Sequence, residues 1–142
     1  MTTVSSSVNI KWVEETFMLG SDSRGRPVAI GNKTGGESEM LGLKASDLLL
    51  LSAAACSTYD VVTILAKQRE PFTAVDVKCT GEQNTEPPYA YVAIHLHYVI
   101  KGAVNTGRVD KAIKLSEEKY CSVIATLRHG VQITSDFEII SE

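Results

Sequence analysis

The sequence has no apolar run as long as a membrane-spanning helix. Its longest nearly apolar stretch, Leu48 to Cys56, is interrupted by Ser52 and covers under half of the ~20 residues that such a helix needs. The amino-terminal residues 1–9 are rich in Ser and Thr, without the basic region and apolar core of a secretory signal. We therefore expect a cytoplasmic protein.

The sequence also has no cluster of basic residues. It contains 14 Lys+Arg against 17 Asp+Glu, which gives a formal net charge of -3. A nucleic-acid-binding surface needs grouped Lys and Arg to neutralise phosphates, so we expect no nucleic-acid partner. The Gly-x-Ser-x-Gly turn of many hydrolases and the glycine patterns of dinucleotide and P-loop sites are missing as well, which argues against these classes.

Cysteine is scarce: the chain has three, which are Cys56, Cys79 and Cys121. They are too few, and odd in number, for an extracellular disulfide framework, and their spacing is not that of a metal knuckle. His95 and His97 alternate on one predicted strand, but no third ligand stands at a useful spacing. We expect no metal site.

The composition that is present is that of an ordinary globular domain. The chain has 142 residues, of which 44% are hydrophobic and 22% charged. These values are typical of one folded unit, so we expect a single domain over residues 1–142.

Hydrophobic periodicity predicts an α+β fold, with antiparallel sheets packed on a long central helix. In chain order, the expected elements are hairpin strands over 8–36 around a turn at 20–27, a mobile loop at 32–39, a helix over 47–69, strands over 72–81 and 89–101, helices over 107–115 and 116–129, and a closing strand over about 131–139. Residues 48–51 and 53–55 are apolar on every side of the long helix, which predicts that this half is buried.

Each cysteine has its own predicted setting. Cys56 follows three alanines at the point where the long helix turns polar, so it is either a small buried hydrophobe or a functional thiol that needs a partner. Cys121 lies inside the predicted helix over 116–129 and is the candidate partner. Cys79 shares a strand face with Val75 and Val77, which favours an inert core thiol.

Two sequence blocks around these cysteines resemble the OsmC/Ohr family of bacterial thiol peroxidases, which are associated with osmotic stress and organic hydroperoxide resistance. Residues 46–65, SDLLLLSAAACSTYDVVTIL, are similar to the family's helix with the reactive cysteine. Residues 115–123, LSEEKYCSV, are similar to its helix with the second cysteine. The resemblance implies an OsmC-like fold and an intertwined homodimer.

The resemblance also implies a chemistry. Cys56 would attack an organic hydroperoxide, release an alcohol and become a sulfenic acid, which Cys121 would convert to a disulfide. An external dithiol would then reduce that disulfide. No cofactor is implied, because sulfur carries the two electrons.

Two positions depart from the family's catalytic pattern. Ser46 stands where the catalytic members have a glutamate, and Asp47 is the nearest carboxylate. Asp47 is a candidate site residue or a helix cap. In one straight helix it lies about 13 Å from Cys56 on the opposite face, so a catalytic role would need a helix break or a second subunit. Arg24 and Arg26, in the hairpin turn, are the candidates for the family's early arginine.

Two classes of function follow from these residues. One is a thiol-dependent peroxidase that acts on organic hydroperoxides. The other is a non-catalytic thiol protein, either a redox sensor or a binder of small apolar ligands. The enzyme would consume peroxide repeatedly in the presence of a dithiol, whereas a sensor would be oxidised once.

Overall fold

The computed structural model describes residues 2–33 and 40–141. Contacts within the chain group into two compact units, Met1–Leu48 and Leu49–Glu142. The single domain expected over the whole chain stays a prediction. Both cysteines of the resemblance lie in the second unit.

The first unit is built from short antiparallel strands. Its elements are β1 (Asn9–Glu14), β2 (Phe17–Ser21) and β3 (Pro27–Ile30) in one sheet, and β4 (Asn32–Lys33) paired with β5 (Met40–Leu41) in another. The predicted hairpin turn is present between β2 and β3, where the Asp22 carboxylate accepts the backbone N–H groups of Arg24 and Arg26 at 2.9 and 2.8 Å. The loop expected at 32–39 begins with the two residues of β4, and its remainder lies outside the described residues.

Helix α1 (Ala45–Lys67) is the long helix that the sequence predicts. It ends where Arg69 adopts a left-handed conformation with φ 57° and the N–H of Glu70 bonds the carbonyl of Leu65 at 3.0 Å. Pro71 follows and cannot continue a helix.

Only one side of α1 is buried by its own chain. Its buried residues are Ala53, Ala54, Ser57, Val61 and Leu65. Leu51 is 50% exposed and Tyr59 is 73% exposed, so the predicted burial of the first half on all sides is wrong for this single chain. By length and composition α1 could cross a membrane, although the central helices of soluble proteins have the same properties.

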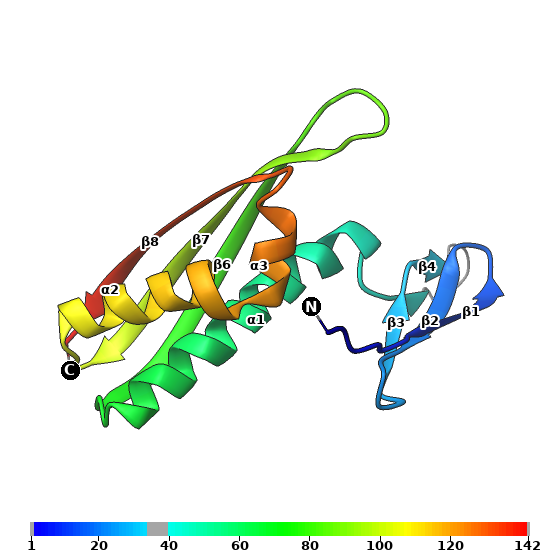
Figure 1. Ribbon diagram of the computed structural model, residues 1–142. Coiled ribbons are helices and arrows are strands. Elements are labelled where there is room, and N and C mark those ends of the chain that lie inside the picture. The colour runs from blue at the N-terminus through cyan, green and yellow to red at the C-terminus, as the bar shows by residue number, and fades with distance from the viewer. Residues whose placement is uncertain (1, 34–39, 142) are drawn as a thin grey trace. The chain divides into compact units, whose positions relative to one another are not determined.

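The second unit contains a three-stranded sheet in the order β6-β7-β8 (Figure 1). Strands β6 (Phe72–Gln83) and β7 (Tyr91–Gly102) form the predicted antiparallel hairpin. The closing strand β8 (Gln132–Ile140) runs parallel to β7, so the all-antiparallel expectation is wrong for this pair. The helices between β7 and β8 return the chain to the end where β7 began, and a parallel pair requires such a crossover.

The crossover contains three helical pieces rather than two helices. Helix α2 (Thr106–Leu115) is capped by Asn105, with the Arg108 N–H bonded to the Asn105 side chain at 3.0 Å. The expected helix over 116–129 is instead a π-helical segment, η1 (Ser116–Tyr120), followed by α3 (Ser122–Leu127). The backbone is extended at Cys121, with ψ 106°, so the two segments cannot join into one helix.

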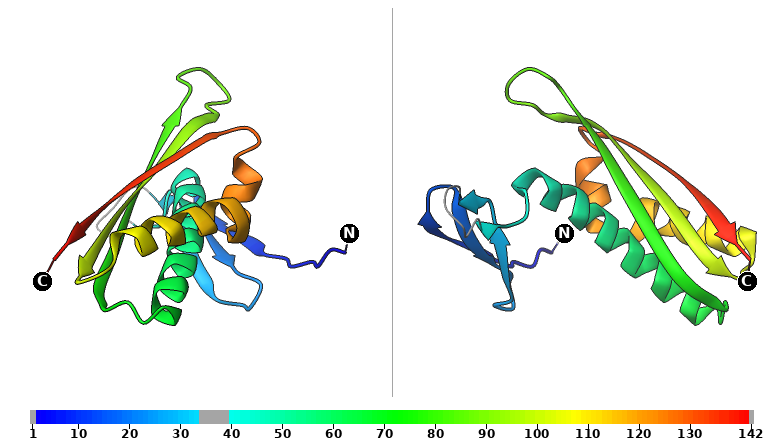
Figure 2. Two further views of the ribbon diagram at one scale, coloured as in Figure 1. Left: turned by 60° about the vertical axis from the view of Figure 1, so that its left-hand side comes forward. Right: turned by 180° about the vertical axis from the view of Figure 1, so that it is seen from behind.

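Helices α1 and α2 cover the same face of this sheet, and Figure 2 shows the arrangement from two further sides. The core lies between the two layers. Strand β7 contributes every second residue to it, as its alternation predicts, and the residues are Ile94, Leu96, Tyr98 and Ile100. Residues from the three helices complete it, among them Val61, Leu65, Val109, Ile113 and Ile124. The thiol-bearing segments therefore pack on a shared core.

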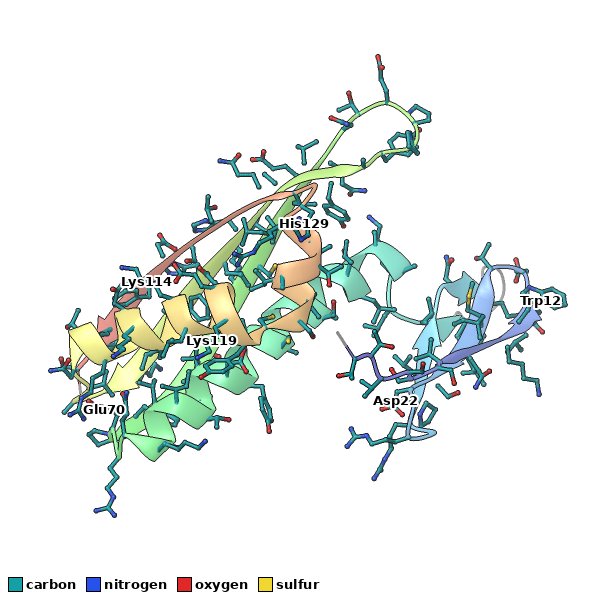
Figure 3. All side chains as sticks on the ribbon, in the orientation of Figure 1. Trp12, Asp22, Glu70, Lys114, Lys119 and His129 are labelled. Carbon is teal, nitrogen blue, oxygen red and sulfur yellow. The ribbon has the colours of Figure 1, made fainter. Side chains whose placement is uncertain are left out.

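The end of α1 is joined to the start of α2 by Glu70, which Figure 3 labels at this junction. The Glu70 carboxylate accepts the backbone N–H of Asn105 at 3.3 Å and the Arg108 guanidinium at 3.4 Å. The Glu70 side chain is 7% exposed. Arg108 also donates to the carbonyl of Gln68 at 3.3 Å, so one arginine connects both helices.

Candidate functional site

Cys56 lies near the middle of α1. Its side chain is partly buried and packs against the hydrophobic core. Ser57, the next residue, faces the interior with 0% exposure. Asp60 follows one helical turn after Cys56, so the thiol and the carboxylate lie along the same side of the helix.

Cys121 is the cap residue at the start of α3. Its backbone is extended, and its Sγ accepts the N–H of Ile124 at 3.4 Å. Cys121 is 2% exposed, and it belongs to the same core cluster against which Cys56 packs. The two thiols of the family resemblance lie close enough for Cys56 to affect the pKa of Cys121.

The two thiols differ in their surroundings. Burial, with a smaller contribution from the neighbouring Cys56, raises the pKa of Cys121 to about 11. The N–H of Ile124 acts in the opposite direction by stabilising the thiolate. Because the thiolate is the nucleophilic form, Cys121 is poorly suited to begin a reaction at neutral pH.

A chain of buried hydroxyl groups runs beside the thiol pair. The hydroxyls of Ser57 and Tyr98 are 2.5 Å apart. Ser116 Oγ hydrogen-bonds Ser57 Oγ at 3.0 Å and Asp60 Oδ2 at 2.8 Å. These contacts link α1, β7 and η1, and burial raises the pKa of Tyr98. The sequence analysis did not identify Ser57, Tyr98 or Ser116 as site residues, because the contacts join positions far apart in the chain.

A groove of about 470 Å³ opens next to these residues. Tyr59, Asp60, Ile64 and Lys67 of α1 line one side, and Leu115 and Tyr120 line the other. Neither Cys56 nor Cys121 lines this groove, but Tyr59 and Asp60 follow Cys56 on α1, and Tyr120 precedes Cys121 in the sequence. Its volume is in the range of small-molecule sites.

The other candidate residues of the resemblance belong to the first unit of the chain. Asp47 lies in the first turn of α1, and that helix continues without a break through Cys56. A role for Asp47 at the thiols therefore requires a second subunit. Arg24 and Arg26 lie in the β2–β3 turn, where the Arg24 side chain is 81% exposed and its Nε lies 3.7 Å from Asp22.

Cys79 and the two strand histidines are placed apart from this chemistry. Cys79 packs against the core, and burial raises the pKa of its thiol. His95 Nε2 and His97 Nδ1 both contact the Asp136 carboxylate, at 2.9 and 2.6 Å. Over residues 2–33 and 40–141, no group of three or more His, Cys, Asp or Glu side chains is arranged to hold a metal ion.

Comparison with known proteins identifies the family. The profile described as OsmC-like protein matches residues 35–136, which include both thiols and the whole crossover. The chain belongs to the OsmC-like family. It is 33% identical to protein YhfA of Escherichia coli K12 over 133 residues, or 93% of this chain and 96% of YhfA.

Solved structures of OsmC-like proteins share the same α+β architecture. A hypothetical protein from Aquifex aeolicus VF5 superposes with a TM-score of 0.87 at 30% identity, covering 99% of both chains. The organic hydroperoxide resistance protein OsmC of Legionella pneumophila superposes with a TM-score of 0.68, covering 97% of this chain and 99% of its own. At 14% identity this second match shows the fold alone. The predicted α+β fold with its long central helix is confirmed, and it is a soluble fold.

Proposed function

We propose that this OsmC-like protein is a thiol-dependent peroxidase that reduces organic hydroperoxides. The observation that carries the proposal is the proximity of the Cys56 and Cys121 thiols at the shared core. Two neighbouring thiols can form a disulfide with little movement of the backbone, because the bond requires only that their Cβ atoms lie close together. The name of the Legionella pneumophila protein associates the same fold with organic hydroperoxide resistance.

The reaction has three balanced steps. The Cys56 thiolate attacks one peroxide oxygen of ROOH, the O–O bond breaks, and the leaving alkoxide takes a proton to give ROH and a Cys56 sulfenic acid. The Cys121 sulfur then attacks that sulfenic acid, forming the disulfide and releasing water. An external dithiol reduces the disulfide by two exchange steps and leaves as its own disulfide.

The structure supports Cys56 as the attacking sulfur and Cys121 as the resolving sulfur. Cys56 is partly exposed, whereas Cys121 is 2% exposed and its pKa is raised to about 11. The groove beside Tyr59 and Asp60 gives a small oxidant a route toward α1. Asp47 is included in the proposal as a residue that acts across a subunit interface.

We place the protein in the cytoplasm as a homodimer within this proposal. Leu51, Ala55 and Tyr59 recur every four residues on α1 and form an exposed stripe, called here the α1 stripe. Apolar side chains at this spacing are typical of a helix face that packs against a partner. A second copy of the chain would cover the α1 stripe and bring a second Asp47 toward the thiols.

A non-catalytic role is the second candidate, because the apolar groove would also hold a small ligand. In that case the thiol pair would respond to oxidation without turnover. The two candidates differ in the number of peroxide molecules consumed for each protein molecule.

The deciding experiment measures consumption of cumene and tert-butyl hydroperoxide by the wild type, Cys56→Ser and Cys121→Ser. Dithiothreitol and dihydrolipoamide are compared as reductants, and Cys79→Ser is the matched control. The peroxidase should turn over many times, lose all activity in Cys56→Ser and keep it in Cys79→Ser. Consumption limited to one equivalent would favour the sensor, and unchanged consumption in Cys56→Ser would reject the proposal.

The dimer is tested by sedimentation velocity. We expect the wild type to sediment at twice the monomer mass and Leu51→Lys to shift toward the monomer, because a buried lysine would lack a partner. Ala66→Lys, at an exposed position of the same helix, is the control. A monomeric wild type at micromolar concentration would contradict this part of the proposal.

A further inference from the structure

We infer that Asp60 and Ser116 are positioning residues that hold Cys121 against Cys56 and thereby set the redox potential of the thiol pair. The inference rests on the proposed thiol function and extends it to residues that carry no sulfur. The side chain of Ser116 hydrogen-bonds residues of α1, and its backbone carbonyl accepts the N–H of Cys121.

The side chain of Ser116 is anchored to the helix that carries Cys56. Its hydroxyl lies 2.8 Å from Asp60 Oδ2 and 3.0 Å from Ser57 Oγ. Ser57 is the next residue after Cys56 in the sequence, and Asp60 follows Cys56 by one helical turn. Any shift of Ser116 away from α1 would therefore break two hydrogen bonds beside Cys56.

The backbone of Ser116 determines where Cys121 lies. Its carbonyl accepts the N–H of Cys121 at 2.8 Å, which closes the π-helical turn of η1. This bond is the C-terminal end of η1, and the next residue begins α3. π-helical turns are rare and often occur at functional sites. In this turn, we infer that the extra residue directs the Cys121 side chain toward α1.

Burial strengthens the hydrogen bonds between Ser116 and α1. Ser57 and Ser116 are both 0% exposed, and the Tyr98 hydroxyl on β7 hydrogen-bonds Ser57. A buried hydroxyl that loses its partner keeps the full cost of its desolvation. The reduced protein therefore holds the two thiols at close range, even though Cys121 begins a helix of only six residues.

Close positioning favours the disulfide over the dithiol. In a glutathione buffer, one molecule of glutathione disulfide oxidises the pair and leaves as two molecules of glutathione, while Cys56 and Cys121 form one S–S bond. The equilibrium constant measures how well the protein holds its sulfurs together. Loosening Cys121 would make the disulfide easier to reduce.

The experiment is a glutathione redox titration of Asp60→Asn, Ser116→Ala and Ser57→Ala, each in a Cys79→Ser background. We expect Ser116→Ala to lower the equilibrium constant for disulfide formation by about tenfold, the effect of one lost buried hydrogen bond. We expect Asp60→Asn to lower it by about threefold, because the amide oxygen still accepts from Ser116 but more weakly than a carboxylate. Ser57→Ala should have a smaller effect, since Ser116 keeps its bond to Asp60.

Ser52→Ala is the matched control. Ser52 lies on the same helix and donates only to the nearby carbonyl of Leu49, at 2.7 Å, so its loss should change the constant by less than about twofold. Near-ultraviolet circular dichroism verifies that each variant is folded. If Ser116→Ala does not fold, Asp60→Asn decides the outcome.

The result is independent of peroxidase activity. A wild type that consumes no peroxide would reject the proposed function, yet its glutathione titration would still measure the thiol pair. Equal constants for folded Asp60→Asn, folded Ser116→Ala and Ser52→Ala would overturn the positioning role. Variants that lower the melting temperature but leave the equilibrium constant for disulfide formation unchanged would also overturn it, because that result indicates a purely structural role.

Discussion

The Cys121 thiol lies near the Cys56 thiol, although one caps a short helix after η1 and the other lies in the middle of α1. Their proximity depends on the shared core, since both segments pack against the same face of the β6-β7-β8 sheet. A pair of thiols held in this way is prepared for reversible disulfide chemistry.

We predict that mild oxidation joins Cys56 to Cys121 and leaves Cys79 free. Cys56 is close enough to affect the pKa of Cys121, whereas Cys79 lies on β6 and packs against the core. Peptide mapping of protein treated with one equivalent of diamide checks this pairing. A disulfide that includes Cys79 in the folded monomer would contradict it.

Alkaline pH should weaken the fold through Cys121. The unfolded thiol loses its proton near its ordinary pKa of 9.0, whereas the folded thiol keeps it until about pH 11. Between these values the unfolded state binds fewer protons, so the free energy of unfolding falls as pH rises, by about 1.4 kcal/mol per pH unit at most. Urea unfolding at pH 8, 9, 10 and 11 measures this slope.

Cys121→Ser is the matched control for that titration, because serine keeps the cap at α3 without titrating in this range. Tyr98 and Cys79 titrate in both proteins, so the difference between the two slopes belongs to Cys121. Parallel slopes for the wild type and the variant would refute the prediction.

His97 should titrate above its ordinary range. The hydrogen bond that His97 donates to the Asp136 carboxylate is the main cause that raises the pKa of His97, and the same bond lowers the pKa of Asp136. The stabilisation is present below the ordinary histidine value of 6.5 and is lost as pH rises through the raised pKa of His97. At acidic pH it is lost as Asp136 is protonated, below its ordinary value of 3.8.

Proton NMR of the histidine rings checks this pair. In Asp136→Asn we expect the pKa of His97 to move down, toward its ordinary value, because the amide carries no charge. Asp76→Asn, on the neighbouring strand β6 opposite Val99, serves as the control. An unchanged His97 titration in Asp136→Asn would show that Asp136 is not the cause.

Removal of the Glu70 carboxylate should loosen the junction of α1 and α2. Glu70→Ala leaves the N–H of Asn105 and the guanidinium of Arg108 without their nearly buried acceptor. We expect the free energy of unfolding to fall by about 1.5 to 3 kcal/mol. Glu86→Ala, in the exposed turn between β6 and β7, should change it by less than about 0.5 kcal/mol.

Much of the fold could be predicted from local sequence signals. Alternation identified β6 and β7 and the buried side of β7, and the helix predicted over 107–115 begins within one residue of the start of α2. The direction of β8 could not be read from its own residues, because an isolated strand pattern is the same for parallel and antiparallel pairing. The break at Cys121 was also missed, since the residues after Ser116 have the composition of an ordinary helix start.

The candidate site was predicted only as a pair of cysteines. The resemblance around Cys56 and Cys121 selected two thiols of three, but their proximity and the hydroxyls beside them depend on distant segments. Ser57, Tyr98 and Ser116 come from α1, β7 and η1. Nothing in the spacing of these residues indicates that they meet.

By itself, the sequence determined where the helices and strands form and which of their sides are apolar, because these properties depend on neighbours a few residues away. Only the tertiary structure decided that β8 runs parallel to β7, that Ser116 bonds Asp60 and that the Cys56 and Cys121 thiols lie near each other. These relationships result from packing α1 and the crossover on one sheet, where burial favours one arrangement of segments that are far apart in the chain.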